Sequence, residues 1–247
     1  MQQKNRSRHR HITSFQVISL GFLSVILLGS LLLMLPIATK SGQCTSFLDA
    51  LFTATSAVCV TGLVIKDTAT YWSLFGQGVI LLLIQIGGMG IITIAIAIAV
   101  VSGRKIGLMQ RSTMQEAISA PTVGGIVRRT QFIIRTTILI EIIGAALLAP
   151  VFCRDFGFWK GIWYSLFHSI SAFCNAGFDI LGTAANPFPS LTGYSANALV
   201  NVVIMLLIVI GGIGFLTWDD IYINKLNFKR YRMQSKIILM TTACLIL

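Results

Sequence analysis

Acidic residues, proline, cysteine and histidine are all scarce in this chain. Its 247 residues include only eight Asp and Glu, five Pro, five Cys and three His. The cysteines form no C-x-x-C pair and no Cys/His spacing typical of zinc, so neither a disulfide framework nor a structural zinc site is expected. Charged residues make up 11% and hydrophobic residues 55%, a composition that excludes an ordinary soluble domain.

Long apolar segments predict an all-α membrane protein with several spans. A run of about 20 apolar residues is long enough to cross a bilayer as a helix. The first run is too long for the apolar part of a signal peptide, and no small-residue cleavage site follows it, so we expect a retained span. The runs lie near Phe15–Ile37, Trp72–Val101, Phe132–Phe152 and Ala198–Thr217, and a fifth begins near Lys236.

The basic residues are unevenly distributed between alternate loops. Fifteen of the 19 Lys and Arg lie before the first span, between the second and third spans, or after the fourth. The positive-inside rule then places the N-terminus and the 102–131 loop in the cytoplasm of a plasma (inner) membrane protein. Topology therefore explains the net charge of +11, and no nucleic-acid partner is expected.

One short segment is present twice, 115 residues apart. Residues 51–63 read LFTATSAVCVTGL and residues 166–178 read LFHSISAFCNAGF, with identity at six positions. Each copy lies between two predicted spans, and each following span carries IGGxG, at Ile86–Gly90 and Ile210–Gly214. Such repetition indicates two copies of one unit, made of a span, a re-entrant segment and a second span.

The repeated segment predicts a pore helix followed by a filter loop. It is too apolar for a solvated loop and too short for a span, so it must enter the membrane from outside and return. Ser46 followed by Asp49 predicts a capped helix from Phe47 to about Ala57. The C-terminal end of its dipole would favour a cation near the membrane centre.

We expect the residues after each pore helix to be extended, with carbonyl oxygens that replace the hydration shell of an ion. None of these residues is charged, so selectivity would come from the number and field of the carbonyl groups. The alternative is that both segments are re-entrant loops that only pack. The candidate filter residues are Cys59, Val60, Thr61, Gly62, Cys174, Asn175, Ala176 and Gly177.

The IGGxG glycines predict close contact between helices, with a gating hinge as the alternative. They are Gly87, Gly88, Gly90, Gly211, Gly212 and Gly214.

Glu141, inside the third span, is either a functional ionisable group or a structural hydrogen-bonding group, and we favour the structural role. His168 is interpreted as a packed polar residue rather than a metal ligand. TVGG at Thr122–Gly125 lies in a basic loop with no apolar helix before it, so we exclude it from the filter.

The chain resembles the Trk/Ktr/HKT superfamily of cation transporters, and in particular the membrane subunit of bacterial Ktr potassium uptake systems. The segments that carry this resemblance are AVCVTGL, SAFCNAGF and the paired IGGxG segments. The resemblance implies four span–pore–span repeats around one path, with a filter glycine in each repeat, matched here by Gly62 and Gly177. It implies potassium as the transported ion, with sodium as the alternative, no covalently bound cofactor and no other metal. It also implies a homodimer on a cytoplasmic nucleotide-binding subunit.

The chain is expected to contain two of these four repeats, as a truncated product, a fragmentary gene model or half of a split protein. Its basic cytoplasmic loops are on the correct side for the nucleotide-binding subunit or for anionic membrane lipid. The expected divisions are a basic N-terminus (1–14), a first repeat (15–101), a cytoplasmic loop (102–131), a second repeat (132–218), a second cytoplasmic loop (219–235) and the start of a third repeat (236–247).

Potassium uptake through a carbonyl filter is the predicted function, and the chain is not expected to be an enzyme. A membrane enzyme is disfavoured because no G-x-S-x-G motif is present and His168 has no second histidine at membrane depth. Two alternatives stay open. One is a sodium-permeable or sodium-coupled transporter of the same kind, and the other is a non-conducting regulatory or assembly subunit.

The uneven charge distribution predicts that Asp67 and Asp155 lie outside the cell and that Arg111 and Arg230 lie inside. With accessible native cysteines removed, Asp155→Cys should react with a membrane-impermeant thiol reagent in intact cells. Arg111→Cys should react only after the cells are opened. Labelling of position 111 in intact cells would contradict this topology.

Overall fold

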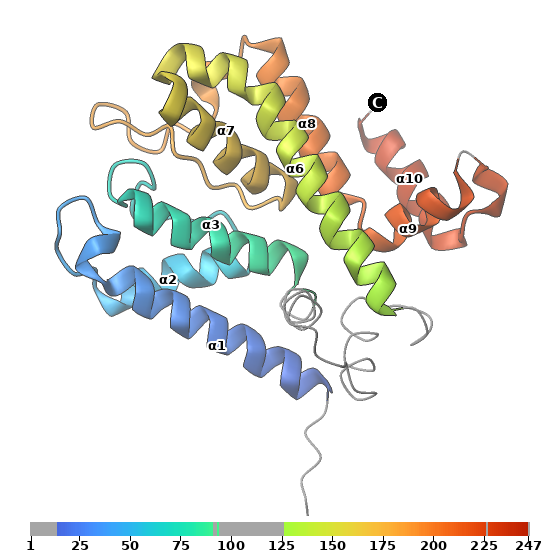
Figure 1. The fold of residues 1–247 in the computed structure, drawn as a ribbon, viewed down its shortest axis with the longest axis horizontal. Helices are drawn as coiled ribbons and strands as arrows, with labels where there is room; N and C mark the ends of the chain where they lie inside the picture. The colour runs from blue at the N-terminus through green and yellow to red at the C-terminus, as the bar shows by residue number, and fades with distance from the viewer. Residues whose placement is uncertain (1–13, 91–92, 94–125, 226, 247) are drawn as a thin grey trace, which may run out of the picture.

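The helices form two similar three-helix units (Figure 1). The computed structural model describes residues 14–90, 93, 126–225 and 227–246, and these contain one isolated β-bridge, between Thr39 and Trp72, but no strand. The all-α prediction is therefore confirmed for this part of the chain. The first unit comprises α1 (Ser14–Met34), α2 (Phe47–Val58) and α3 (Leu74–Met89), and the second comprises α6 (Ile126–Phe156), α7 (Phe158–Phe173) and α8 (Ala198–Gly212).

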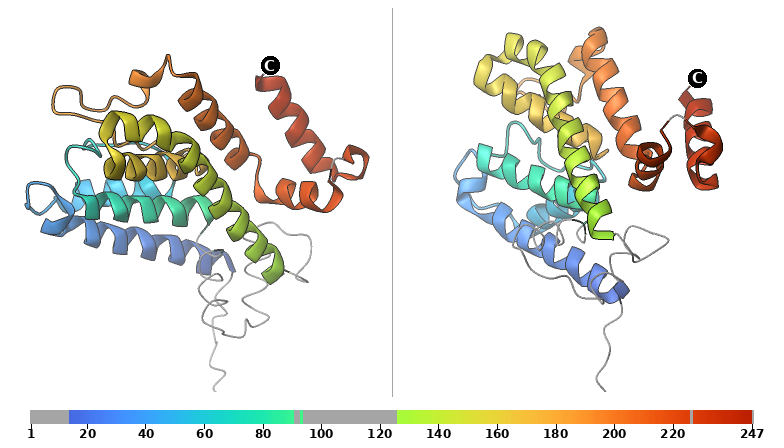
Figure 2. Two further views of the ribbon diagram at one scale, coloured as in Figure 1. Left: turned by 45° about the horizontal axis from the view of Figure 1, so that its top comes forward. Right: turned by 45° about the vertical axis from the view of Figure 1, so that its right-hand side comes forward.

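The two units join where α3 packs against α7. Figures 1 and 2 show α3 lying between α1 on one side and α7 on the other. Trp72, Phe152 and Phe167 are fully buried members of the hydrophobic core. Large apolar side chains on the outer faces of α1, α6 and α8 stay exposed, including Leu28, Leu139 and Met205. Apolar outer faces of this kind suit contact with lipid.

Two described helices are long and apolar enough to cross a membrane alone, over Gln16–Met34 and Thr130–Phe156. The second runs beyond both ends of the predicted span, and α6 contains Pro150 within its last two turns. Only Leu74–Met89 and Thr93 of the predicted second span are described as helical.

The short helix α2 is built as its sequence predicts. Ser46 is its N-cap, and the Ser46 hydroxyl accepts a hydrogen bond from the Asp49 N–H at 3.2 Å. The cap satisfies one of the free N–H groups of the first turn. A helix over Phe47–Ala57 is thus confirmed, with one more residue at its C-terminal end.

The predicted fourth span over Ala198–Thr217 is wrong as a single straight helix. Helix α8 ends at Gly212, and α9 (Phe215–Asn224) continues at 92° to it (Figure 2). Gly214 lies between them with φ of +87°, a conformation that L side chains rarely adopt. The indole N–H of Trp218 donates to the Ile210 carbonyl oxygen at 3.1 Å and stabilises the bend. Helix α9 therefore lies partly where a cytoplasmic loop was expected.

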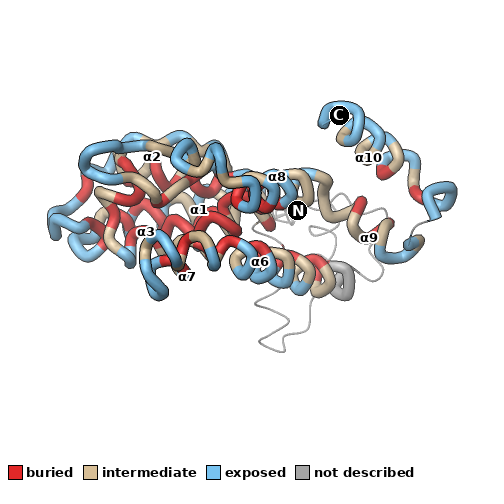
Figure 3. Tube along the Cα trace, turned by 90° about the horizontal axis from the view of Figure 1, so that it is seen from above, coloured by how far each residue is buried: buried red, intermediate tan, exposed pale blue. Residues whose placement is uncertain are grey.

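A turn links α9 to α10 (Met233–Ile246), the helix that lies where a further span was expected to begin. The Asp220 carboxylate accepts hydrogen bonds from the Arg232 backbone N–H and the Asn224 side-chain amide, each at 2.7 Å. These bonds close the turn, although the turn and α10 lie apart from the two three-helix units (Figure 3). The short 3-10 helices are η1 (Pro36–Ala38), η2 (Thr192–Tyr194) and η3 (Phe228–Arg230).

The packing of α3 generates a test with a matched control. A Cβ atom on Gly76 would overlap the Ala38 carbonyl oxygen, whereas one on Gly78 would meet nothing within 4 Å. Gly76→Ala should therefore destabilise the protein by roughly 1–3 kcal/mol through overpacking. Gly78→Ala should be neutral, or stabilising by up to about 1 kcal/mol through helix propensity. Thermal unfolding in detergent measures both, and equal losses in the two variants would contradict this packing.

Candidate ion-filter site

The structure brings the two predicted filter loops into contact, backbone against backbone. A Cβ atom added to Gly62 would lie 2.7 Å from the Ala176 carbonyl oxygen and 3.3 Å from the Cα atom of Gly177. One added to Gly177 would lie 3.5 Å from the Cα atom of Gly62. The two glycines, 115 residues apart in the sequence, therefore lie in contact, and a side chain at Gly62 would clash with the second loop.

Each loop begins with a hydrogen-bonded turn rather than with extended backbone. Cys59 and Cys174 keep right-handed helical backbone as C-caps of α2 and α7. In each unit the next residues close a Schellman motif, with Thr61 N–H bonding to Ser56 O and Ala176 N–H bonding to Ser171 O. The prediction of four extended residues is thus wrong for the first two in each loop, because the helix ends must satisfy their carbonyl groups.

The left-handed position of this turn is filled differently in the two units. Val60 has φ of 56° and Asn175 has φ of 58°. Asn tolerates this conformation, but a β-branched residue rarely adopts it, and such positions typically cost about 1–3 kcal/mol. The first loop therefore contains local strain that the second loop lacks.

A serine supports each loop from its own pore helix. The Ser56 hydroxyl lies 2.8 Å from the Thr61 hydroxyl, and the Ser171 hydroxyl donates to the Phe178 carbonyl oxygen at 2.6 Å. Both serines are buried. Neither serine was predicted as a site residue, although their identity in the two copies was a usable signal.

The IGGxG glycines lie beside the C-terminal ends of the pore helices. A Cβ atom on Gly87 would overlap the Val58 carbonyl oxygen, and one on Gly211 would overlap that of Phe173. A Cβ atom on Gly88 would lie 2.5 Å from the Cys174 sulfur, and one on Gly212 would lie 3.9 Å from the Asn175 side-chain nitrogen. Gly90 and Gly214 have positive φ next to the ends of α3 and α8. The close approach at Gly87 and Gly211 fits the packing role, and the helix ends at Gly90 and Gly214 fit the hinge role. Both roles therefore remain predictions.

Glu141 links the two units beneath the loops. The Gln85 side-chain amide donates to both Glu141 carboxylate oxygens, at 2.9 and 3.1 Å. The Ser169 hydroxyl donates to the Glu141 backbone carbonyl at 2.7 Å. Glu141 thus has the hydrogen bonds to neighbouring elements that its structural interpretation requires.

Two acidic residues lie on the outer side of the loops. The buried Asp67 carboxylate accepts hydrogen bonds from the Thr70 N–H and hydroxyl, each at 2.7 Å, and from the Phe188 N–H at 2.9 Å. It thereby fastens the outer loop of the second unit, which joins the second filter loop to α8, to the first unit. Burial, opposed by the Leu181 N–H and reinforced by the Asp67 charge, raises the pKa of Asp179 above its usual value.

His168, on α7, packs among aromatic rings. Its ring centroid lies 5.3 Å from that of Phe152 on α6 and 6.0 Å from that of Phe167 on α7. Across the described ranges, no group of three or more His, Cys, Asp or Glu side chains is arranged to hold a metal ion. The TVGG segment at residues 122–125 and the basic loop at 104–111 lie outside the described residues.

Comparison with known proteins assigns the chain to a family. A family model described as TrkH, cation transport protein, matches residues 1–242. The chain belongs to the TrkH family. The suspected relationship to Trk/Ktr membrane subunits is therefore confirmed, and the chain belongs to a family of cation transporters.

Relatives in this family are potassium uptake proteins by name. The chain is 41% identical over 244 residues to the potassium/sodium uptake protein NtpJ of Enterococcus hirae, a match that covers 99% of the chain and 52% of that protein. It is 42% identical over 230 residues to the Ktr system potassium uptake protein B of Bacillus subtilis, covering 93% of the chain and 50% of that protein. The corresponding protein of Vibrio alginolyticus is 34% identical over 233 residues, with 94% and 50% covered. The chain thus spans about half the length of these relatives.

The Asp67 contacts predict how the outer loop is held. Asp67→Ala removes the acceptor of the Phe188 N–H, so amide exchange at Phe188 should accelerate by about tenfold, the equivalent of one hydrogen bond. Thr70→Val is the control, since it removes one hydroxyl and leaves the bond between Asp67 and Phe188 intact. Hydrogen–deuterium exchange of peptides covering residues 183–191 measures both variants. Equal exchange in both would show that Asp67 does not hold this loop.

Proposed function

We propose that this part of the chain supplies two loops of a potassium filter, in the pore subunit of a Ktr-type uptake system in the plasma membrane. The observation that carries the proposal is the backbone contact between Gly62 and Gly177, each just beyond the C-terminal end of a short helix. Two packing loops would not need a glycine at the same place in both copies. Two filter loops need it, because neighbouring loops must approach one ion together.

The filter would act through carbonyl oxygens and helix dipoles. The C-terminal ends of α2 and α7 direct partial negative charge towards the loops, which favours a cation there. Carbonyl groups of Cys59–Gly62 and Cys174–Gly177 would replace the water of the ion. The Phe178 carbonyl oxygen, just beyond the second loop, accepts a hydrogen bond from the Ser171 hydroxyl, which holds the backbone there in place.

These two loops would form one side of the path, and further loops would complete the coordination. Thr61, Asn175 and Gly177 are exposed, although their neighbours Ala57, Ala172 and Ala176 are buried. Exposed backbone at membrane depth requires a protein or water partner. The exposed edge of the two loops is therefore the surface that would face the ion and the remaining loops.

Potassium is the ion that the glycine in the first loop favours, and sodium is the alternative. The names of the relatives include both ions. The carbonyl filter has no charged residue, so preference would depend on the spacing of the carbonyl groups, which a side chain at position 62 would change.

A cytoplasmic nucleotide-binding subunit, a second copy of the pore subunit and anionic lipid are the proposed partners. The relatives named as parts of a Ktr system support a multi-component assembly. With the N-terminus in the cytoplasm, the turn between α9 and α10 would face the same side. Its basic residues Lys225, Lys229 and Arg230 suit contact with an acidic partner or lipid headgroup.

Gly62→Ser in the complete transporter should weaken the preference for potassium over sodium by roughly tenfold, the equivalent of about 1.4 kcal/mol. The added side chain would press on the Ala176 carbonyl oxygen, which lies 2.7 Å from the Cβ position. Gly42→Ser is a matched control. Gly42 has a similar φ of +70°, but a Cβ atom there meets nothing within 4 Å.

The measurement is the initial rate of potassium uptake, with and without competing sodium, in cells that lack other potassium uptake systems. Gly42→Ser places a side chain at a similar positive φ and should keep the ion preference of the parent. Unchanged preference in Gly62→Ser, or an equal loss in both variants, would remove Gly62 from the filter.

A further inference from the structure

Helix α3 touches the starting points of both filter loops. A Cβ atom on Gly87 would overlap the carbonyl oxygen of the last residue of α2, and one on Gly88 would lie 2.5 Å from the sulfur of Cys174, at the end of α7. Gln85 lies on the same turn of α3, and its side chain bonds to Glu141 of α6. The position of this turn relative to the second unit therefore affects both loops.

Glu141 is anchored to two further helices. Its carboxylate oxygens accept hydrogen bonds from the Gln85 amide of α3, at 2.9 and 3.1 Å, and its backbone carbonyl accepts one from the Ser169 hydroxyl of α7, at 2.7 Å. Glu141 is 4% exposed and Ser169 is fully buried. The residue thus ties α3, which packs on the first pore helix, to α7, which leads into the second loop.

The carboxylate and the amide depend on each other. Among the described residues, Gln85 provides the one side-chain donor to the Glu141 carboxylate, and the Oε1 atom of Gln85 is buried without a hydrogen-bond partner. A hydrogen bond to a carboxylate is strong and directional, and a buried carboxylate without a donor is costly. The pair therefore favours one position of α3 against α6.

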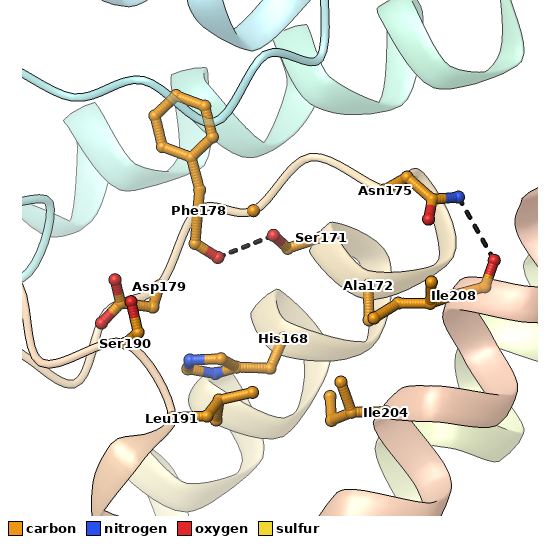
Figure 4. A pocket seen from close by; sticks show the side chains of 11 residues that line it. His168, Ser171, Ala172, Asn175, Phe178, Asp179, Ser190, Leu191, Ile204 and Ile208 are labelled. Carbon is orange, nitrogen blue, oxygen red and sulfur yellow. Dashed lines mark hydrogen bonds between the residues drawn. The ribbon is translucent and has the colours of Figure 1, made fainter.

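Hydrogen bonds within the second unit fix the shape of the second loop (Figure 4). The Ser171 hydroxyl donates to the Phe178 carbonyl oxygen at 2.6 Å, and the Asn175 amide donates to the Ile208 carbonyl oxygen of α8 at 3.4 Å. Both bonds hold the loop to helices of its own unit. They leave its distance from the first loop to the contacts that join the two units.

The equivalent positions of the repeat carry no polar side chain. A Cβ atom on Gly144, three residues after Glu141, would lie 2.8 Å from Leu207, and one on Gly29 would lie 2.7 Å from Leu83. The 115-residue offset of the pore helices thus holds for α1 and α6 as well, and the IGGxG segments align α3 with α8. The residues equivalent to Glu141, Ser169 and Gln85 are Ile26, Ala54 and Val209, in that order. The common fold therefore does not require these polar groups, which belong to the junction between the two units.

We propose that Glu141 is a positioning residue for ion selectivity, held by Gln85 and Ser169 so that it fixes the spacing between the two filter loops. Glu141 would not touch the ion. A filter without charged side chains discriminates between ions by the number and placement of its carbonyl groups, so a shift of α3 relative to α7 would change the preference. This inference rests on the proposed filter function.

The first test exchanges the two side chains in the complete transporter. Gln85→Leu leaves the Glu141 carboxylate without its donor and should reduce the preference for potassium over sodium by about three- to tenfold. Combining Gln85→Glu with Glu141→Gln keeps an amide–carboxylate bond in the reverse direction. This exchange should restore the preference to within about twofold of the parent, because the two positions act as a pair. No restoration in the exchanged pair would contradict the proposal.

An apolar pair separates positioning from stability. Combining Gln85→Leu with Glu141→Leu removes both polar groups, so the thermal stability lost in Gln85→Leu should return. Two leucines pack without a preferred direction, so the ion preference should stay reduced by about threefold or more. A purely structural role predicts that preference and stability recover together, and that result would overturn the proposal.

Two serines of α7 provide a matched comparison. Ser165 and Ser169 are both buried, and each hydroxyl donates at 2.7 Å, but Ser165 bonds to Gly161 of its own helix and Ser169 bonds to Glu141 of α6. Ser169→Ala should reduce the ion preference by about two- to threefold, and Ser165→Ala should leave it unchanged. Equal preference in the two variants would contradict the proposal. This comparison also decides the case if Gln85→Leu does not assemble.

Hydrogen–deuterium exchange tests the support of the loops without ion transport. The amides of Thr61 and Ala176 close the turns after α2 and α7. In Gln85→Leu and Ser169→Ala they should exchange about three- to tenfold faster than in the parent, and in Ser165→Ala they should not change. Unchanged exchange in the first two variants would overturn the proposal. If the parent takes up no potassium, the filter function fails, and the exchange rates still decide whether Glu141 holds the loops.

Discussion

The contact between the two glycine loops is the constraint on which the rest of the structure depends. Non-helical backbone at membrane depth must find partners in protein or water, since lipid offers none. Here the loops meet each other at Gly62 and Gly177, and their first residues complete the hydrogen bonds at the ends of α2 and α7. Each pore helix thus stabilises the loop that follows it, and each loop limits where the other can lie.

Close backbone approach explains much of the remaining packing. Gly87 and Gly211 let α3 and α8 touch the last carbonyl groups of the pore helices, where any side chain would force them apart. Small residues at helix contacts are the usual means of association in membranes, where the hydrophobic effect does not draw helices together. Hydrogen bonds from Gln85 to Glu141 and from Phe188 to Asp67 then connect the two units on either side of the loops.

The two units share a backbone but differ in chemistry at three places. The left-handed position is Val60 in one loop and Asn175 in the other, and the pore helices carry Thr53 and His168 at corresponding positions. One loop has Val64 where the other has Asp179. A path of the proposed kind, built from such units, would be only approximately symmetric, and each loop would contribute a different share of selectivity and of support.

The sequence by itself determined the helical class, the repeat, the short helix after Ser46 and the family, because apolar run length, a repeated segment and a local cap can all be recognised without knowing which segments meet in space. It also located the eight candidate filter residues, whose role as a filter stays a prediction. Only the tertiary structure decided that Cys59 and Val60 form a turn, that α8 and α9 meet at 92°, and that Ser56, Ser171 and Asp67 support the loops. For Asp67 the physical reason is a hydrogen bond to a residue far away in the sequence, which no local pattern records. The turns and the bend close through hydrogen bonds between near neighbours, but they depend on backbone angles that the residue types alone do not specify.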